Sequence, residues 1–364
     1  MHPFYIILFL ESFLAFVFYI GSTSTYTKGR RTAKYREQGY LILAFGILFF
    51  FHAFRDPYSL ADIPEYADAY KESFSYTWRR ILSDHFVSLK SEVGFRLIIK
   101  GISSVFSSYQ MLFVLTSVFL LLSFYQATKR YSVYFFISVM VFTVNSYAES
   151  LFMLRSFLAI GILLLTFPYI LERKIVPFLL LNILAMSIHV SAVIFLPVYF
   201  LYGVNKSKWI WAIFIIVGGF FMLKFDDIIS YIVERYLPGY SYYFIYIDNY
   251  EGASWKMPAL LGLLLLMRVA VLRKHFFDMG ITRLLSILMV LAFVVYTAGM
   301  GFGLTSRMAM FFTNMTFLIL PDTVSHMKNK KLGVLISIIY IIFNGYFFLR
   351  NSTDALWINY HLVL

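Results

Sequence analysis

Long apolar stretches alternate with short polar ones along this chain, and each is close to the length of a membrane-spanning helix. Such a helix needs about 20 apolar residues to cross roughly 30 Å of hydrocarbon, and charged residues are rare inside these stretches. The pattern therefore predicts an all-α, polytopic membrane protein. The predicted helices lie at about 3–21, 38–54, 110–127, 131–147, 153–171, 208–225, 256–272, 281–302, 306–321 and 332–349.

The stretch 175–203 fits either one long helix or two short helices broken around 187–191. Loop charge favours the break, because lysine and arginine are enriched in cytoplasmic loops. If the first helix runs from outside to inside, two crossings in 175–203 place the basic turns in the cytoplasm. These turns lie at 28–36, 129–130, 173–174, 206–208, 273–274 and 328–331. We therefore expect about twelve helical segments with both termini outside, and a retained first helix instead of a cleaved signal peptide.

Two external loops follow from this topology. The first, at about 55–109, mixes charges of both signs and ends in GFRLIIKGISSVFSS. Its apolar residues have helical spacing, so we expect a helix along the membrane surface. The second, at about 226–255, is rich in tyrosine, which suits either interfacial packing or carbohydrate. No repeat or low-complexity linker divides the chain, so residues 1–364 are expected to form a single integral-membrane domain.

Composition supports the membrane assignment and excludes several functions. Hydrophobic residues make up 60% of the chain and charged residues 14%, and the mean hydropathy is +0.76, which is outside the range of soluble domains. The formal net charge of +12 is scattered among short loops, which suits an anionic membrane surface and not a nucleic acid. The chain has no cysteine and no nucleotide-cradling, zinc-protease or serine-hydrolase motif. We therefore expect neither a metal nor a cofactor.

Three arginines, Arg55, Arg155 and Arg307, stand at the edges of apolar runs on the predicted external side. A guanidinium at the edge of hydrocarbon is costly and tends to be kept for a partner, and its planar fork suits a phosphate. These residues are therefore candidates for binding a pyrophosphate. The alternative is that they snorkel to the lipid headgroups, with Asp56 neutralising Arg55 and Glu149 pairing with Arg155.

His189 and Asp62 are the candidate acid–base groups. His189 lies at the predicted helix break, where irregular backbone is tolerated only if it is buried or lines a polar space. The alternative role is that of a satisfied core histidine. Asp62 follows Arg55 by seven positions and precedes Tyr66, and a carboxylate near a sugar hydroxyl can take its proton as the bond forms. The choice between the two stays open.

The order of these residues resembles the EpsG family, the Wzy-like polymerases of bacterial surface polysaccharides. That family has an arginine after the second helix with a later aspartate and tyrosine, a Glu-x-Gly-Phe segment, an Arg-x-x-Leu-Ala helix start, a basic turn, an Ala-x-x-x-His-x-Ser-Ala segment leading into Leu-Pro-x-Tyr, and a late arginine. Here these features lie at Arg55, Asp62 and Tyr66, at 92–95, 155–159, 172–174, 185–192 and 195–199, and at Arg307. The resemblance extends to about residue 321 and is most specific at 155–200. The glycine and threonine that usually flank the family's aspartate are Leu60 and Ile63 here, and the glutamine that usually follows the helix-start arginine is Ser156. The first departure leaves Asp56 as an alternative to Asp62.

The resemblance implies a glycosyltransferase of GT-C type on the external face of the bacterial inner membrane. It would move a growing exopolysaccharide, O-antigen or capsule chain from undecaprenyl pyrophosphate to a fresh lipid-linked oligosaccharide repeat, without a metal. Its partners would be these oligosaccharides, the membrane lipids and a chain-length-regulating co-polymerase. The implied roles are pyrophosphate binding for Arg55, Arg155 and Arg307, catalysis for His189 or Asp62, and support for Glu92, Glu149 and Tyr66.

Two other functions stay open. A ligase would move a finished glycan from the same carrier to another acceptor, with the same chemistry at the pyrophosphate. A transporter or flippase of lipid-linked glycan is the non-enzyme alternative. Such proteins often show repeated halves and ionisable residues in mid-helix, whereas here the candidate residues gather at one predicted face. Deletion separates the two enzymes, because single repeats accumulate without a polymerase and long unattached chains without a ligase.

Overall fold

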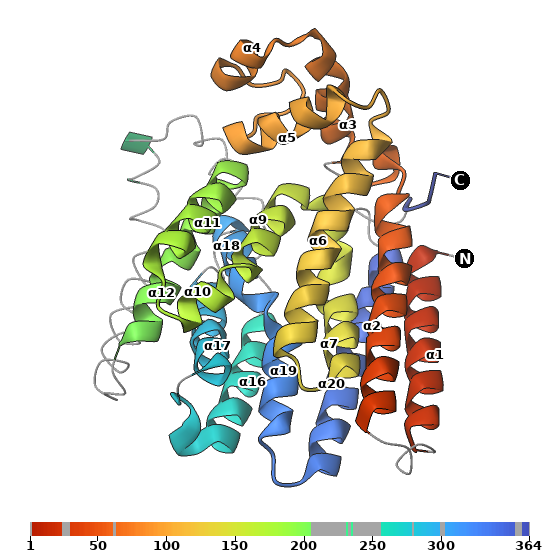
Figure 1. Ribbon diagram of the computed structural model, residues 1–364, viewed down its shortest axis with the longest axis vertical. Coiled ribbons are helices and arrows are strands. Elements are labelled where there is room, and N and C mark those ends of the chain that lie inside the picture. Colours follow the sequence, from red (N-terminus) through yellow and green to blue (C-terminus); the bar gives the residue numbers. More distant parts are fainter. Residues whose placement is uncertain are drawn as a thin grey trace.

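The computed structural model describes residues 2–23, 30–60, 63–204, 231, 234–235, 256–278, 280–298, 303–353 and 359–363. Within these residues the regular structure is helical, and one isolated β-bridge joins Arg55 to Leu362. The longer helices stand side by side in a bundle whose long axis is vertical in Figure 1. Short helices cover one end of this bundle.

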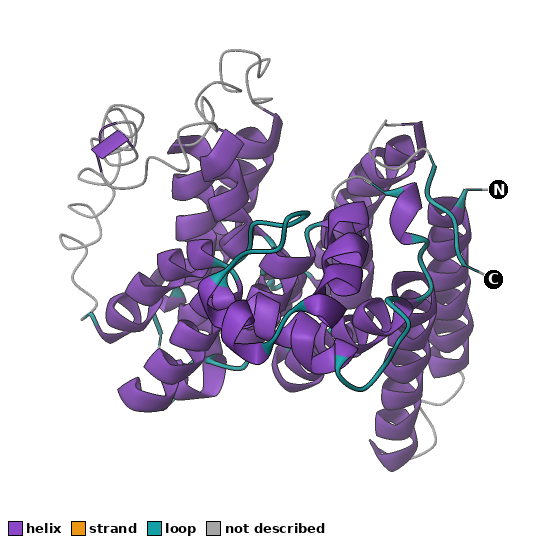
Figure 2. Cartoon of the chain, turned by 90° about the horizontal axis from the view of Figure 1, so that it is seen from above, coloured by secondary structure: helices purple, strands orange, loops and turns teal. Residues whose placement is uncertain are grey.

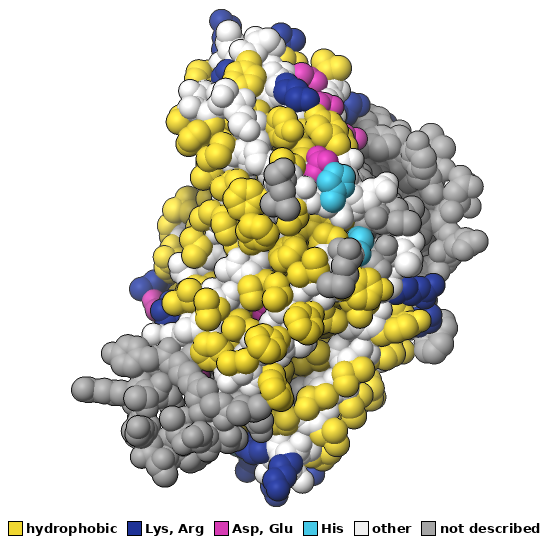
Figure 3. All heavy atoms as spheres, turned by 90° about the vertical axis from the view of Figure 1, so that its right-hand side faces the viewer, with side chains coloured by type: hydrophobic (Ala, Val, Ile, Leu, Met, Phe, Trp, Pro, Cys, Tyr) yellow, Lys and Arg dark blue, Asp and Glu magenta, His cyan; other side chains and the backbone are white. Residues whose placement is uncertain are grey.

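Four helical stretches in the described part of the chain are long and apolar enough to cross a membrane. They are α6 (Gln110–Tyr131), the combined stretch Phe135–Phe152, α17 (Ile281–Ala298) and α20 (Lys330–Arg350). Shorter apolar helices accompany them. Figure 3 shows a broad apolar surface in the middle of one face, with lysine and arginine side chains at its upper and lower ends. The chain is therefore a helical membrane protein, and the number of crossings stays a prediction.

The first two helices lie beside both ends of the chain. These helices are α1 (Pro3–Thr23) and α2 (Arg30–Ala53). The C-terminal segment 359–363 lies along the C-terminal end of α2, where the Val363 N–H donates to the Phe54 carbonyl at 2.8 Å. The Tyr360 ring packs 5.6 Å from that of Phe4, so both ends of the chain lie at one edge of the bundle (Figure 2).

Two predicted helices are broken in the structure. The run at 153–171 forms α9 (Leu154–Leu164) and α10 (Phe167–Leu171), because Pro168 has no N–H for the carbonyl of Leu164 and its ring would crowd it. The run at 306–321 forms α18 (Gly303–Thr313) and α19 (Thr316–Ser325). The predictions of single helices there were wrong. The predicted helix at 208–225 and almost all of the predicted loop at 226–255 lie outside the described residues.

The predicted break in 175–203 is confirmed. Helix α11 (Ile175–Ile188) ends at the break, and a 3-10 helix (Val190–Phe195) leads into α12 (Leu196–Gly203). The hydroxyl of Tyr199 donates at 2.7 Å to the carbonyl of Arg173, which precedes α11. The chain has therefore turned back to the level at which α11 began, and the two halves run in opposite directions.

Residues 57–103 form the cap, which covers one end of the bundle (Figure 1). Its helices are η1 (Pro57–Ser59), α3 (Ile63–Glu72), η2 (Ser73–Ser75), α4 (Trp78–Ser83) and α5 (Val93–Ser103). The side chain of Thr77 caps α4 by accepting the N–H of Arg80, which satisfies one of the free donors of a helix start. Helix α5 is the predicted amphipathic helix. Its buried Phe95 and Ile99 pack on the protein itself, so its apolar face supports the cap.

A buried ion pair that the sequence pattern did not predict joins helices in the other half of the bundle. Arg268 of α16 (Lys256–Leu272) donates to Asp322 of α19 at 2.8 Å. Arg268 also donates to Ser286 of α17 at 3.0 Å and to Thr323 at 2.6 Å. Most of the polar atoms of the pair have hydrogen-bond partners, so no charge is buried without compensation. These bonds connect α16, α17 and α19.

Candidate functional site

The carboxylate of Glu92 joins two of the predicted site residues at the junction of the cap and the bundle. Its Oε2 accepts a 2.8 Å hydrogen bond from Nη1 of Arg155. Its Oε1 lies 3.3 Å from Nδ1 of His189 and accepts the Val190 N–H at 2.9 Å. One carboxylate therefore holds a guanidinium and an imidazole that are far apart in the sequence.

The local sequence explains why these three elements meet. Glu92 is the residue just before α5, and Gly94 in the first turn of α5 touches the end of α11. A Cβ at Gly94 would lie 2.6 Å from the carbonyl oxygen of Ser187, so only glycine allows this approach. His189 follows Ser187 after the end of α11. The Glu-x-Gly-Phe segment thus brings its carboxylate to the histidine.

Phe95, the last residue of the Glu-x-Gly-Phe segment, packs against Tyr66. The two buried rings meet edge to face with centroids 5.4 Å apart. Tyr66 also interacts through its side chain with Arg155, and it lies within electrostatic range of Arg55. Tyr66 therefore stands near both arginines, and its supporting role stays a prediction.

The electrostatics of the site favour an ionised carboxylate. Burial alone would raise the pKa of Glu92, but the contact with His189, the charge of Arg155 and the Val190 N–H together lower it to about 2. The side chains of Glu92, Arg155 and His189 are 18%, 22% and 21% exposed. The site is therefore half-enclosed and still open to a ligand from outside.

Arg307 extends the same site from a fourth element. It is exposed in the second turn of α18, so the helix begins earlier than predicted. Phe311, one helical turn further on, stacks against His189 with ring centroids 6.2 Å apart. Because residues four apart share a helix face, Arg307 lies one turn from the ring that supports the imidazole.

Arg55 lies behind the site and not on its surface. Its side chain is fully buried, Nη1 lies 2.8 Å from Nδ1 of His52, and its guanidinium stacks over the ring of Phe113 at 4.7 Å. Its Nε and Nη2 atoms have no hydrogen-bond partner among the described residues. The C-terminal segment covers it through the bridge to Leu362. The expectation of an arginine at an open mouth does not hold for Arg55 in this conformation.

The alternative partners of the arginines were wrong. Asp56 does not neutralise Arg55: it caps η1 and lies 2.7 Å from Nε2 of His361. Arg155 pairs with Glu92 and not with Glu149, which lies in the last turns of the stretch Phe135–Phe152. Asp62 lies outside the described residues, so its role stays a prediction.

Two other matching segments meet at the opposite end of the bundle. Arg173 of the basic turn has a positive φ of 58°, and its guanidinium lies over the ring of Tyr199 at 4.2 Å and donates to the Tyr199 carbonyl. Tyr199 returns a hydrogen bond to the Arg173 carbonyl. The basic turn and the Leu-Pro-x-Tyr segment thus clasp the α11–α12 hairpin, which is a structural role.

No group of three or more His, Asp or Glu side chains suited to a metal occurs in the described part of the chain. What the site offers is cationic forks for an anion and one imidazole for proton transfer. The sequence analysis named Glu92, Arg155, His189 and Arg307, but it did not predict that Glu92 would join Arg155 to His189 or that Phe311 would stack on the imidazole.

Comparison with known proteins identifies the family of the chain. Searches of curated proteins and of solved structures gave no significant match. The sequence model of the EpsG family matches residues 39–362, which is nearly the whole chain and includes each residue of the site. This membrane protein therefore belongs to the EpsG family.

Proposed function

We propose that this protein polymerises a bacterial surface polysaccharide at the outer face of the cytoplasmic membrane. The donor is a growing glycan on undecaprenyl pyrophosphate, and the acceptor is a lipid-linked oligosaccharide repeat. The observation that carries the proposal is the half-open cluster in which Glu92 holds Arg155 and His189 together. Membership of the EpsG family supports a polymerase-like activity.

The reaction needs two things that this cluster offers. A hydroxyl oxygen of the acceptor sugar attacks the anomeric carbon of the donor, and the bond from that carbon to the pyrophosphate oxygen breaks. The hydroxyl proton passes to a base, and undecaprenyl pyrophosphate leaves with the extra negative charge. Fixed cations stabilise that charge as it develops, and a positioned imidazole takes the proton.

The roles follow from position and access. Arg155, which is held by Glu92, and the exposed Arg307 bind the pyrophosphate. The Glu92 carboxylate lies 3.3 Å from Nδ1 of His189, which leaves Nε2 for the acceptor hydroxyl. Arg55, buried behind Tyr66, contributes positive charge through space. The cluster thus combines leaving-group stabilisation with one proton acceptor.

The test is to incubate purified protein with one lipid-linked repeat and to separate the products by size. A ladder of products from the wild type, and its loss in His189→Ala, is the expected result. A nearly normal rate in His189→Ala would transfer the role of base to Asp62. A single transfer to a different acceptor, without a ladder, would identify a ligase and refute the polymerase.

A further inference from the structure

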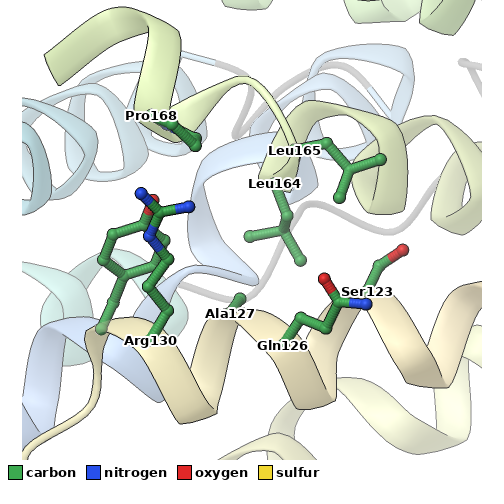
Figure 4. Close-up of a pocket in the computed structure, with 8 residues that line it drawn as sticks. Ser123, Gln126, Ala127, Arg130, Leu164, Leu165 and Pro168 are labelled. Carbon is green, nitrogen blue, oxygen red and sulfur yellow. The ribbon is translucent and has the colours of Figure 1, made fainter. Parts of the chain in front are cut away.

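A pocket lies far from the cluster, between the last turns of α6 and the link from α9 to α10 (Figure 4). Its cavity volume is about 70 Å³, and it is partly open to the surroundings. Gln126, Arg130 and Tyr131 line it from α6, and Leu164, Leu165 and Pro168 line the other wall. One wall is therefore polar and the other apolar.

The polar wall continues a surface of α6 that otherwise suits lipid. Leu115, Val118 and Leu122 are exposed at helical spacing along this helix, and Gln126 follows one turn later and is also exposed. Its side-chain amide makes no hydrogen bond within the described part of the chain. An unpaired amide at the edge of the hydrocarbon is stabilised by a hydrogen bond to a polar group of a ligand.

Arg130 adds a positive charge one turn beyond Gln126. It is exposed, and its guanidinium lies 5.4 Å from the centre of the Tyr131 ring. The carboxylate of Glu172 lies within electrostatic range of Arg130, but it is paired with Lys174 at 2.8 Å. Arg130 therefore has charge available for an anion.

The depth of the pocket indicates which anion. Helix α6 is 22 residues long and apolar enough to cross a membrane, so its last two turns lie at the level of the lipid headgroups. Basic pockets between membrane helices at this depth suit lipid phosphates. The apolar wall provides a surface for an acyl chain.

We propose that this pocket binds an anionic membrane phospholipid. The phosphate lies against Arg130, the glycerol ester oxygens accept the amide of Gln126, and one acyl chain packs along Leu164, Leu165 and Pro168. This site lies at the end of α6 opposite to the cap, because Gln110 at the first turn donates to the Ala53 carbonyl at the C-terminal end of α2. The proposal does not depend on the polymerase activity.

The experiment compares lipid binding to the full-length protein, to two charge-matched variants and to a third variant with unchanged net charge. Purified protein in neutral detergent is titrated with phosphatidylglycerol and, separately, with phosphatidylcholine, and bound lipid is counted by native mass spectrometry. We expect Arg130→Gln to weaken phosphatidylglycerol binding by about fivefold, since one basic residue near the surface contributes about 1 kcal/mol. Lys129→Gln removes the neighbouring exposed charge outside the pocket and should leave the affinity unchanged. Gln126→Leu should weaken binding without changing net charge.

Three outcomes would overturn the proposal. Equal losses in Arg130→Gln and Lys129→Gln would indicate general surface charge instead of a pocket. Equal binding of both lipids would exclude recognition of the anionic headgroup. Competition by inorganic phosphate at the same concentration as the lipid would identify a free-anion site without a lipid. Because the three substituted side chains are exposed, unfolding temperatures without lipid should match the wild type and show that the variants are folded.

Discussion

Replacing Glu92 with glutamine tests the centre of the proposed site. The substitution keeps the shape of the side chain and an oxygen that can accept the Val190 N–H. It removes the negative charge that stands between Arg155 and His189. Breaking a partly buried pair in this way leaves the other charge uncompensated, and this destabilises the folded protein.

The size of the effect follows from the pKa of the carboxyl group. It falls from 4.5 to about 2 in the folded protein, which corresponds to about 3 kcal/mol in favour of the ionised form. Because the folded pKa is the lower one, this stabilisation is complete above pH 4.5 and is lost as the pH falls towards 2. Glu92→Gln should therefore lower the free energy of unfolding by about 3 kcal/mol at pH 7, and the difference from wild type should shrink between pH 4.5 and pH 2.

The assay is unfolding in detergent, followed at pH 7, 4.5 and 3. Asp68→Asn is the matched control in the same cap, because its ion pair with Lys71 at 3.3 Å is half exposed. Such a pair contributes about 0–1 kcal/mol. Equal stability of Glu92→Gln and wild type at pH 7, or a difference that persists unchanged at low pH, would refute this account of the carboxylate.

Three further substitutions test other parts of the structure. Arg155→Lys keeps the charge but loses the fork, so chain formation should fall by about 10²-fold or more; wild-type product ladders would contradict this role. Gly94→Ala should force α5 away from α11 and lower the free energy of unfolding by about 1–3 kcal/mol, measured by thermal unfolding. Gly101→Ala in the same helix meets open space and should leave the stability unchanged. Asp322→Asn removes the charged partner of Arg268 and should lower the free energy of unfolding by about 3–5 kcal/mol, with normal activity per folded molecule. An unchanged unfolding temperature would show that the ion pair does not stabilise the fold.

The sequence predicted the helices well because hydrophobic length is a local property. It also located the break at His189, where loop charge required the chain to turn back. The predicted helix at 153–171 was wrong at Pro168, because an apolar run does not show where a proline interrupts it. Helix existence was thus easier to predict than helix ends.

The site was predictable as a set of residues but not as a geometry. The matching segments named Glu92, Arg155 and His189, yet their spacing does not show that one carboxylate holds the other two side chains. The burial of Arg55 depends on the C-terminal segment, which lies more than 300 positions away in the sequence. The pair of Arg268 and Asp322 likewise forms only when three helices pack together.

The most direct test of the central claim is the affinity of the purified protein for undecaprenyl pyrophosphate. If Arg155 and Arg307 hold the diphosphate, Arg155→Lys and Arg307→Gln should each weaken binding by about tenfold or more, as expected for loss of a charge-assisted hydrogen bond. Both variants binding this lipid as tightly as the wild type would show that the diphosphate is held elsewhere.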